Sequence, residues 1–209
     1  MFKKPILIFD FDGTLADTHQ YIVEIFNSFS SYYNYHTIPW DKIENFKDKT
    51  PREIIQMLKI PPLKIPRLLS KAKKKYHLGL CGLKPFEGLK ETLYALKEAG
   101  IKMGILSSNS KENIVPFLEN HGLDIFDFIH TTTSVLSKNA ALKKIIAQKK
   151  ISFDQVLYIG DEIRDIIAAK KLGIKVAAVS WGYNSAHTLS SYQPDFLFEQ
   201  PSDIAAVIE

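Results

Sequence analysis

From about residue 85 onward, apolar runs of strand length alternate with stretches of helical length. FEGLKETLYALKEAG predicts an amphipathic helix that ends at a glycine, and the apolar run IKMGILSS follows it. The alternation continues through SKENIVPFLENHG, FDFIHT, SKNAALKKIIAQKK, QVLYIGD, EIRDIIAAKKLG, KVAAVS and DFLF. Strands separated by helices of this length form parallel βαβ units. The pattern therefore predicts an α/β fold whose core is a doubly wound, Rossmann-like parallel sheet.

One more apolar run, PILIFDFD, stands near the N-terminus and predicts a first strand that is buried on both faces. The next segment predicts helices and no strand. Apolar positions recur with helical spacing over residues 18–29, TPREIIQML begins with a capping box, and a basic helix is expected over residues 65–77. We therefore expect a core domain of residues 1–15 and 83–209, and an inserted helical cap domain of residues 16–82.

The composition limits the partners of this chain. Its 209 residues are 45% hydrophobic, which is enough for a buried core, and its net charge of +4 is too small to indicate nucleic acid. The basic run from Lys64 to Lys75 lacks interleaved aromatic residues, so we expect a solvated helix face there. The single cysteine, Cys81, excludes an intrachain disulfide. Since no segment is long enough to span a bilayer, we expect a cytoplasmic protein without a membrane partner. The sequence does not indicate an oligomeric state.

Polar side chains follow the predicted strands at their carboxyl ends or in the segments after them. Ligands of open parallel sheets bind beyond those ends, near the point where the strand order reverses, so we expect these side chains around one crevice. Alternation along the first strand predicts that Asp10 and Asp12 share one side, with Phe11 on the other. The candidate residues are Asp10, Asp12, Ser107, Ser108, Asn109, Lys138, Asp161 and Asp165.

Clustered carboxylates repel one another unless a cation joins them. Oxygen ligands without histidine or cysteine favour a hard ion, and Mg²⁺ is the usual choice beside phosphate. Lys138 and the Ser108 hydroxyl would donate to phosphate oxygens. Asp10 is then a candidate nucleophile toward phosphorus. Asp12 would protonate the leaving alkoxide and later deprotonate the attacking water.

Four motifs appear in order along the chain: DxDGT[LV] at residues 10–15, GILSSN with Ser108 followed by Asn109, Lys138, and GDEIRD at residues 160–165. With them the chain resembles the haloacid dehalogenase superfamily, in the branch that carries a helical cap after the first strand. The resemblance implies that Asp10 is the nucleophile and Asp12 the acid/base. It also implies Mg²⁺ bound by the Asp10 carboxylate, the Asp12 backbone carbonyl and Asp161.

The segment GDEIRDIIAAKKLGIKVAAVSWGYNS is similar to phosphoglycolate-phosphatase-type members. This resemblance implies a Mg²⁺-dependent phosphatase for a small phosphorylated metabolite, with phosphoglycolate as the named candidate. The cap would close over such a substrate and exclude water. A phosphomutase of the same superfamily is the alternative, and a non-catalytic phosphoacceptor module is a weaker one. A dehalogenase is disfavoured because it needs neither the metal nor the second acid.

Each candidate residue also has an ordinary structural interpretation. Lys138 could lie on a solvated helix face, Asp161 could be a helix N-cap, and Asp165 could face solvent. We nevertheless expect Asp165 to be a water-mediated or supporting metal ligand. Ser107 is an alternative to Ser108. Arg52, in the cap, either reaches the substrate, as an arginine does in some capped relatives, or is a surface residue.

Overall fold

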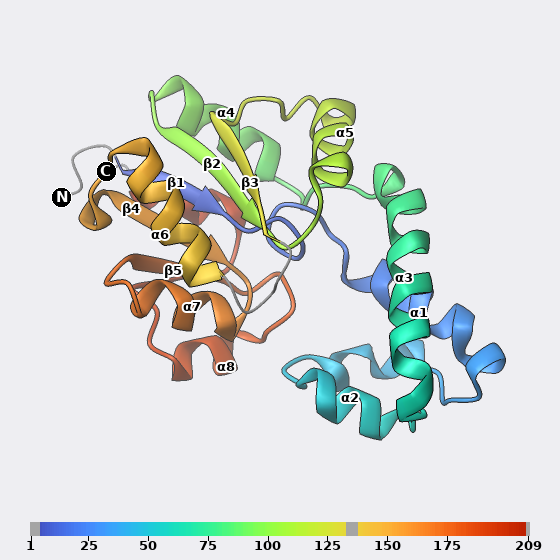
Figure 1. Cartoon of the computed structure of the whole chain (residues 1–209). Coiled ribbons are helices and arrows are strands. Elements are labelled where there is room, and N and C mark those ends of the chain that lie inside the picture. Colours follow the sequence, from blue (N-terminus) through green and yellow to red (C-terminus); the bar gives the residue numbers. More distant parts are fainter. Residues whose placement is uncertain (1–4, 133–137, 208–209) are drawn as a thin grey trace. The chain divides into compact units, whose positions relative to one another are not determined.

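A computed structural model describes residues 5–132 and 138–207, apart from the side chain of Cys81. The chain divides into two compact units (Figure 1). The larger unit consists of Met1–Asp17 and Leu83–Glu209, and the smaller unit of Thr18–Gly82, so the first division falls two residues after the predicted one. Across the described residues, no helix has the length and apolar character that crossing a membrane requires. The predicted helix start at Ser137 lies outside the described residues.

The larger unit contains a six-stranded parallel sheet in the order β3-β2-β1-β4-β5-β6. This is a doubly wound order, so the predicted fold class is confirmed. β1 lies at the centre, where Phe9 pairs with Ile105 of β2 and with Ile159 of β4. The strands are β1 (Ile6–Phe9), β2 (Lys102–Ser107), β3 (Phe128–Thr131), β4 (Val156–Gly160), β5 (Lys175–Val179) and β6 (Phe196–Phe198).

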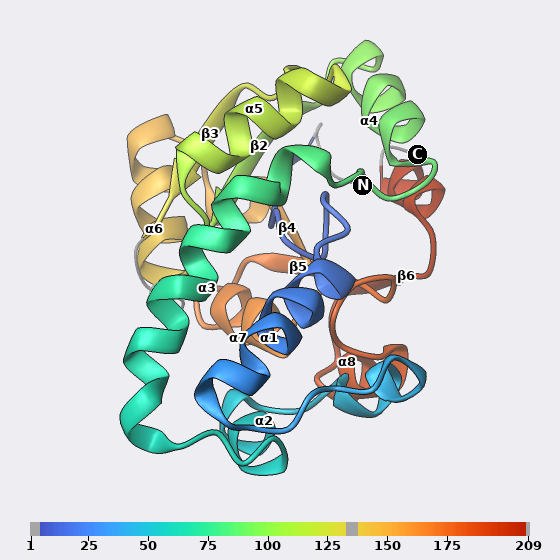
Figure 2. The ribbon, with the colours of Figure 1, turned by 90° about the vertical axis from the view of Figure 1, so that its right-hand side faces the viewer.

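Helices cover both faces of the sheet (Figures 1 and 2). The crossovers from β1 to β2 and from β2 to β3 step one way along the sheet, and those from β3 to β4 and from β4 to β5 step the other way. Right-handed crossovers therefore place α4 and α5 on one face and α6 and α7 on the other. These elements are α4 (Leu89–Glu98), α5 (Lys111–His121), α6 (Lys138–Lys149), α7 (Ile163–Lys170), α8 (Ala186–Ser191) and the 3₁₀ turns η5 (Phe153–Gln155) and η6 (Pro201–Val207).

The strand order reverses between β1 and β4, which is the switch point of the sheet. The core on the α6 and α7 face includes Ile8, Tyr158 and Leu142, all fully buried. Because side chains alternate along a strand, the intervening residues of β1 and β4 pack toward α4 and α5. The sheet is thus rigidly packed on both sides, and its carboxyl-end residues at the switch point are held in fixed positions.

The smaller unit is helical and has its own apolar core. The capping box of α2 is present as the sequence indicates, with Thr50 and Glu53 bonded reciprocally. The basic run is only partly solvated: the Lys71 ammonium lies 4.3 Å from the ring centroid of Tyr32, and Lys64 donates to the Tyr33 carbonyl at 2.9 Å. The elements are α1 (His19–Tyr33), α2 (Pro51–Met57), α3 (Ile65–Gly79) and the 3₁₀ turns η1 (Trp40–Phe46), η2 (Pro62–Lys64) and η3 (Leu80–Gly82).

α8 and the short 3₁₀ turns of both units were absent from the sequence prediction. Each is seven residues or shorter, so none contains enough turns for a helical period to show in the sequence. α8 nevertheless has a local signal, since the Ser185 hydroxyl accepts the N–H of Thr188 at 3.2 Å and forms its N-cap.

Candidate active site

Asp10 lies directly beyond the end of β1 and is 3% exposed. Its N–H still donates to the Ile159 carbonyl at 2.8 Å, which ties it to β4 across the switch point. One carboxylate oxygen accepts the Phe11 N–H at 2.8 Å, and the other pairs with the Lys138 ammonium. The Phe11 ring is buried and packs edge-on against Phe117, with centroids 5.1 Å apart. Asp10 is therefore buried but oriented by three separate bonds.

Asp161, which follows β4, is also buried, and its carboxylate is bonded at both oxygens. Oδ1 accepts the Thr14 hydroxyl and Oδ2 accepts the Tyr183 N–H, each at 2.8 Å. The turn after Asp10 approaches this carboxylate so closely that a Cβ on Gly13 would lie 2.2 Å from Asp161 Oδ2. Gly13 also has φ +73°, which glycine adopts without strain. Gly13 and Thr14 of the DGT sequence thus allow the turn after β1 to contact the Asp161 carboxylate.

The segment after β5 supports Asp161 from another side. The Asn184 N–H donates to the Asp161 carbonyl at 3.2 Å, and its side-chain oxygen accepts the Ile163 N–H at 2.9 Å. A Cβ on Gly182 would lie 2.3 Å from both Asp161 Cβ and the Gly13 carbonyl oxygen. No motif in the sequence predicts a supporting role for Gly182 or Asn184. The available signal was the placement of WGYN immediately after a strand at the same edge of the sheet.

Lys138 and Asp165 form a buried ion-paired group with Asp10. The Lys138 ammonium contacts a carboxylate oxygen of each aspartate, and Lys138 is 2% exposed. Asp165 is fully buried and also accepts the Glu162 N–H at 3.1 Å and the Tyr158 hydroxyl at 3.4 Å. The interpretations of Lys138 on a solvated helix face and of Asp165 facing solvent are therefore wrong.

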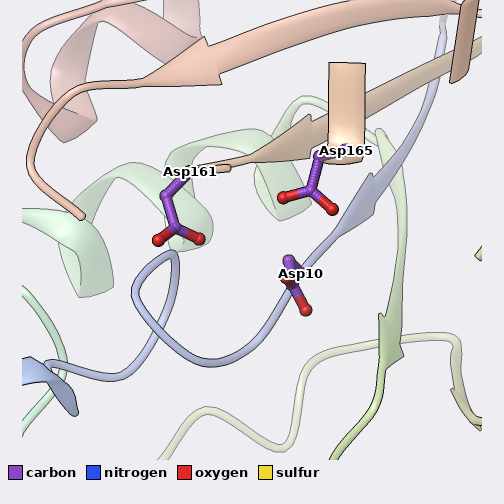
Figure 3. Close-up of side chains that lie close together, drawn as sticks. All are labelled: Asp10, Asp161 and Asp165. Atoms are coloured by element: carbon purple, nitrogen blue, oxygen red, sulfur yellow. The ribbon is translucent and has the colours of Figure 1, made fainter. Parts of the chain in front are cut away.

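Three buried carboxylates face one another at this end of the sheet (Figure 3). Each of Asp10, Asp161 and Asp165 offers an oxygen within 4.8 Å of the others. With Lys138, the group carries a net charge of −2 when all three acids are ionised. We call these four residues the carboxylate cluster.

The pKa values of the carboxylate cluster reflect this charge imbalance. Burial raises the pKa of Asp10, and the Asp165 carboxylate adds to this, against the lowering effect of Lys138. Burial, Glu162 and Asp10 together raise the pKa of Asp161 well above its ordinary value. Burial would lower the pKa of Lys138, but the Asp10 and Asp165 carboxylates raise it well above its ordinary value. The single ammonium of Lys138 thus does not balance the negative charge of the three carboxylates.

A divalent cation fits this donor set. All its donors are carboxylate oxygens, which suits a hard ion such as Mg²⁺, and a charge of +2 would balance the remaining −2. The carboxylate of Asp12 is not among the three acids of the carboxylate cluster. The implied contact of Asp12 with the metal through its backbone carbonyl stays a prediction.

Of the candidates at the end of β2, Asn109 contacts Asp12. Asp12 is partly exposed, and its carboxylate oxygens lie 3.2 and 3.4 Å from the side-chain nitrogen of Asn109. Ser107 is fully buried and accepts the Asn109 N–H at 3.0 Å, whereas Ser108 is partly exposed. Either serine remains a candidate for phosphate binding. Arg52 is exposed in the first turn of α2 in the smaller unit, so its substrate contact stays a prediction.

Glu162, and not Asp161, is the N-cap of α7, so the interpretation of Asp161 as a helix cap is wrong. Glu162 also pairs with Arg164. Burial raises the pKa of Glu162 to about 7, although Arg164 lowers it. When Glu162 is ionised, its pairing with Arg164 adds no net charge beside the carboxylate cluster.

Comparison with known proteins gives three findings. Residues 7–179 match the model of the family described as haloacid dehalogenase-like hydrolase. The chain is 34% identical over 203 residues to a phosphoglycolate phosphatase of Synechococcus elongatus, covering 97% of this chain and 96% of that protein. It is 26% identical to the pyrophosphatase PpaX of Anoxybacillus flavithermus, covering 97% and 95%.

A solved structure has the same fold. It is a haloacid dehalogenase-like family protein, SP0104, from Streptococcus pneumoniae, with a TM-score of 0.85, 20% sequence identity and coverage of 98% of each chain. This likeness spans both units of the chain.

Proposed function

The chain belongs to the haloacid dehalogenase-like hydrolase family and is a hydrolase of the phosphatase type, and we propose that it hydrolyses a small phosphomonoester with Mg²⁺ as its cofactor and an aspartyl-phosphate as its intermediate. The observation that carries this proposal is the carboxylate cluster, in which three buried acids lie together and one lysine pairs with two of them. A net charge of −2 in a buried group favours a divalent cation and, once that is bound, a phosphate dianion.

The residues that would hold Mg²⁺ are Asp10 and Asp161, with the backbone carbonyl of Asp12, and Asp165 would contribute through a water molecule or as a supporting residue. When bound, the ion would neutralise the acids and stabilise the negative charge that develops on the phosphoryl oxygens. The rigid bonds to Asp161 from Thr14 and Tyr183 support this assignment, since they would fix the ligand before the ion arrives.

Asp10 is the proposed nucleophile. One of its carboxylate oxygens attacks phosphorus, the bond from phosphorus to the ester oxygen breaks, and Asp12 gives its proton to the departing oxygen. A water molecule then attacks the phosphorus of the aspartyl-phosphate while Asp12 takes its proton. Inorganic phosphate leaves, and the Asp10 carboxylate is regenerated. The burial of Asp10 and the partial exposure of Asp12 support these different roles, because only Asp12 must exchange protons with substrate and water.

Lys138 would donate to a phosphoryl oxygen and keep Asp10 ionised between turnovers. Ser108, with Ser107 as its alternative, would donate a hydroxyl to the same phosphoryl group. Asn109 and Arg52 are the remaining substrate-binding candidates. The pairing of Lys138 with Asp10 supports the role of the lysine, since the phosphoryl group would be transferred to the atom next to its ammonium.

The substrate is proposed from the relatives. Phosphoglycolate is the first candidate because a phosphoglycolate phosphatase is 34% identical over nearly the whole chain. Pyrophosphate, a phosphoanhydride and not a monoester, is a second candidate because a pyrophosphatase is 26% identical. Both are small anions, as expected for an enzyme with a cap domain. The test is a phosphate-release screen over small phosphorylated metabolites that includes both compounds, with Asp10→Asn as the control. Release from none of them, or equal release by the control, would refute the proposal.

EDTA provides the test of the metal. We expect phosphate release to stop in EDTA and to return with added Mg²⁺. Full activity in EDTA would exclude a metal-dependent mechanism. A phosphomutase differs only in the fate of the aspartyl-phosphate, so a strict requirement for a bisphosphate activator, with isomerised product and no free phosphate, would favour that alternative.

A further inference from the structure

One asparagine, Asn109, contacts the proposed acid/base, and a second, Asn113, contacts Asn109; neither has an assigned catalytic role. We propose that Asn109 and Asn113 form a positioning pair that orients the carboxylate of Asp12 for proton transfer. The inference rests on the proposed function in one respect, namely the acid/base role of Asp12. Asn113 is not among the motif residues, and Asn109 would have a positioning role in addition to substrate binding.

The contacts connect distant parts of the chain. Asn109 lies in the turn between β2 and α5, and its side-chain nitrogen reaches the oxygens of Asp12, 97 residues away in sequence, at 3.2 and 3.4 Å. Asn113 lies in the first turn of α5 and is 5% exposed. Its side-chain nitrogen donates to the Asn109 side-chain oxygen at 2.7 Å. The side chain of Asn109 thereby links α5 to the partly exposed carboxylate of Asp12.

The direction of the Asn109 amide is decided by its neighbours. An asparagine side chain has a donor end and an acceptor end, and only the donor end can bond a carboxylate. The oxygen of Asn109 accepts two N–H groups, from Asn113 and from the Ser110 backbone at 2.9 Å. The Asn109 backbone N–H donates to Ser107 Oγ at 3.0 Å, which fixes the turn. The amino end must therefore face Asp12.

A neutral amide is well suited to this position. Asp12 must hold a fixed place while it alternates between ionised and protonated forms, and proton transfer falls steeply with misplacement of the donor. A lysine or arginine there would form an ion pair and oppose protonation. An amide donor restrains the carboxylate without adding charge. In the neighbouring carboxylate cluster a charged partner, Lys138, contacts the proposed nucleophile Asp10. The neutral partner Asn109 contacts the proposed acid/base Asp12.

Substitution of Asn113 separates positioning from packing. Asn113→Ala removes one of the two donors to the Asn109 oxygen, so that the amide is held by the Ser110 N–H alone and is less firmly oriented. Asn113→Asp keeps the shape but offers only acceptors when ionised, so it attracts the amino end of Asn109 away from Asp12. We therefore expect activity to fall in the order wild type, Asn113→Ala, Asn113→Asp, whereas a packing role predicts that the isosteric variant is the better of the two. Asn120→Asp, exposed on the same helix, controls for the added charge.

The readout is the dependence of kcat/KM on the leaving group. Phenyl phosphate and 4-nitrophenyl phosphate have similar shapes, but nitrophenolate is the better leaving group and needs less help from a general acid. We expect Asn113→Ala to lower kcat/KM about tenfold for phenyl phosphate and less than about threefold for the nitro compound, within the roughly 10²–10⁴-fold range of general acid–base catalysis. Asn120→Asp should match the wild type on both.

Comparison of the two substrates, and of the Asn113 variants with Asp12→Asn, separates failure of the positioning pair from failure of the proposed function. Equal losses on the two substrates, or Asn113→Asp at least as active as Asn113→Ala, would overturn the positioning pair. If Asp12→Asn shows the leaving-group-dependent loss while the Asn113 variants behave as wild type, the pair alone is refuted. If Asp12→Asn leaves both rates unchanged, the acid/base assignment of the proposed function falls and the pair falls with it. Thermal unfolding checks each variant, and Asn109→Ala, expected to show the same selective loss, replaces any that does not fold.

Discussion

Replacement of Lys138 by methionine tests the electrostatic account of the carboxylate cluster. Lys138→Met keeps the length and apolar volume of the side chain but removes the only ammonium in the carboxylate cluster, so that with all three acids ionised the charge of the cluster changes from −2 to −3. Lys138 is 2% exposed and contacts both Asp10 and Asp165, so solvent cannot screen the loss. Removal of one partner from a buried ion pair costs about 3–5 kcal/mol.

The assay is thermal unfolding in EDTA. For a chain of this length, 1 kcal/mol shifts the midpoint by about 2–4 °C, so Lys138→Met is expected to unfold roughly 6–20 °C below the wild type. Lys143→Met, an exposed lysine on the same helix, is the matched control and should change stability by less than about 0.5 kcal/mol. Asp165→Asn in the Lys138→Met background removes one acid and should recover part of the loss.

Added Mg²⁺ gives a second measurement on the same proteins. Because a cluster with one more negative charge attracts a divalent cation more strongly, Mg²⁺ should raise the unfolding midpoint of Lys138→Met by more than that of the wild type. A variant as stable as the wild type in EDTA, with no recovery from Asp165→Asn and no larger response to Mg²⁺, would refute the argument that uncompensated charge defines this site.

The remaining predictions concern the catalytic acids, the close turn and the smaller unit. Asp10→Asn should abolish phosphate release while circular dichroism shows an intact fold; retained release would remove Asp10 as nucleophile. Asp12→Asn should lower kcat by about 10²–10⁴-fold, and an unchanged rate would contradict its acid/base role. Gly13→Ala should lower both stability and activity, because its Cβ would lie 2.2 Å from Asp161 Oδ2, and a fully active variant would show that this approach is not required. Burial raises the pKa of Tyr35 to about 12, so the folded state retains a proton that the unfolded state loses above about pH 10. The stability advantage of the wild type over Tyr35→Phe should therefore shrink between about pH 10 and 12 in denaturant titrations, and a constant difference would contradict that shift.

Much of the candidate site could be predicted because its signals are local. Asp10 and Asp161 each follow an apolar strand, and parallel strands bring their carboxyl ends to one edge of the sheet. Gly13 follows from the same logic, since a turn that approaches a ligand site closely has no space for a Cβ.

Other features depended on contacts between distant segments. The sequence predicts a phosphate-binding role for Lys138 but leaves a solvated helix face open, because further lysines follow it. The fold decides between them, since it places the ammonium between Asp10, 128 residues earlier, and Asp165, 27 residues later. Asn184 and Gly182 enclose Asp161 only because β5 lies beside β4. Asn113 has an ordinary position in the first turn of a helix, and its link to Asp12 passes through the side chain of Asn109.

The sequence by itself determined the alternation of strands and helices, the inserted helical segment and the acids at the strand ends, because hydrophobic period and turn chemistry act over a few residues. Only the tertiary structure decided which charges are buried together, which amide end faces Asp12 and which backbone groups fix Asp161. Those contacts depend on the packing of segments that are far apart in the chain, and local residue patterns do not show which distant segments will pack together.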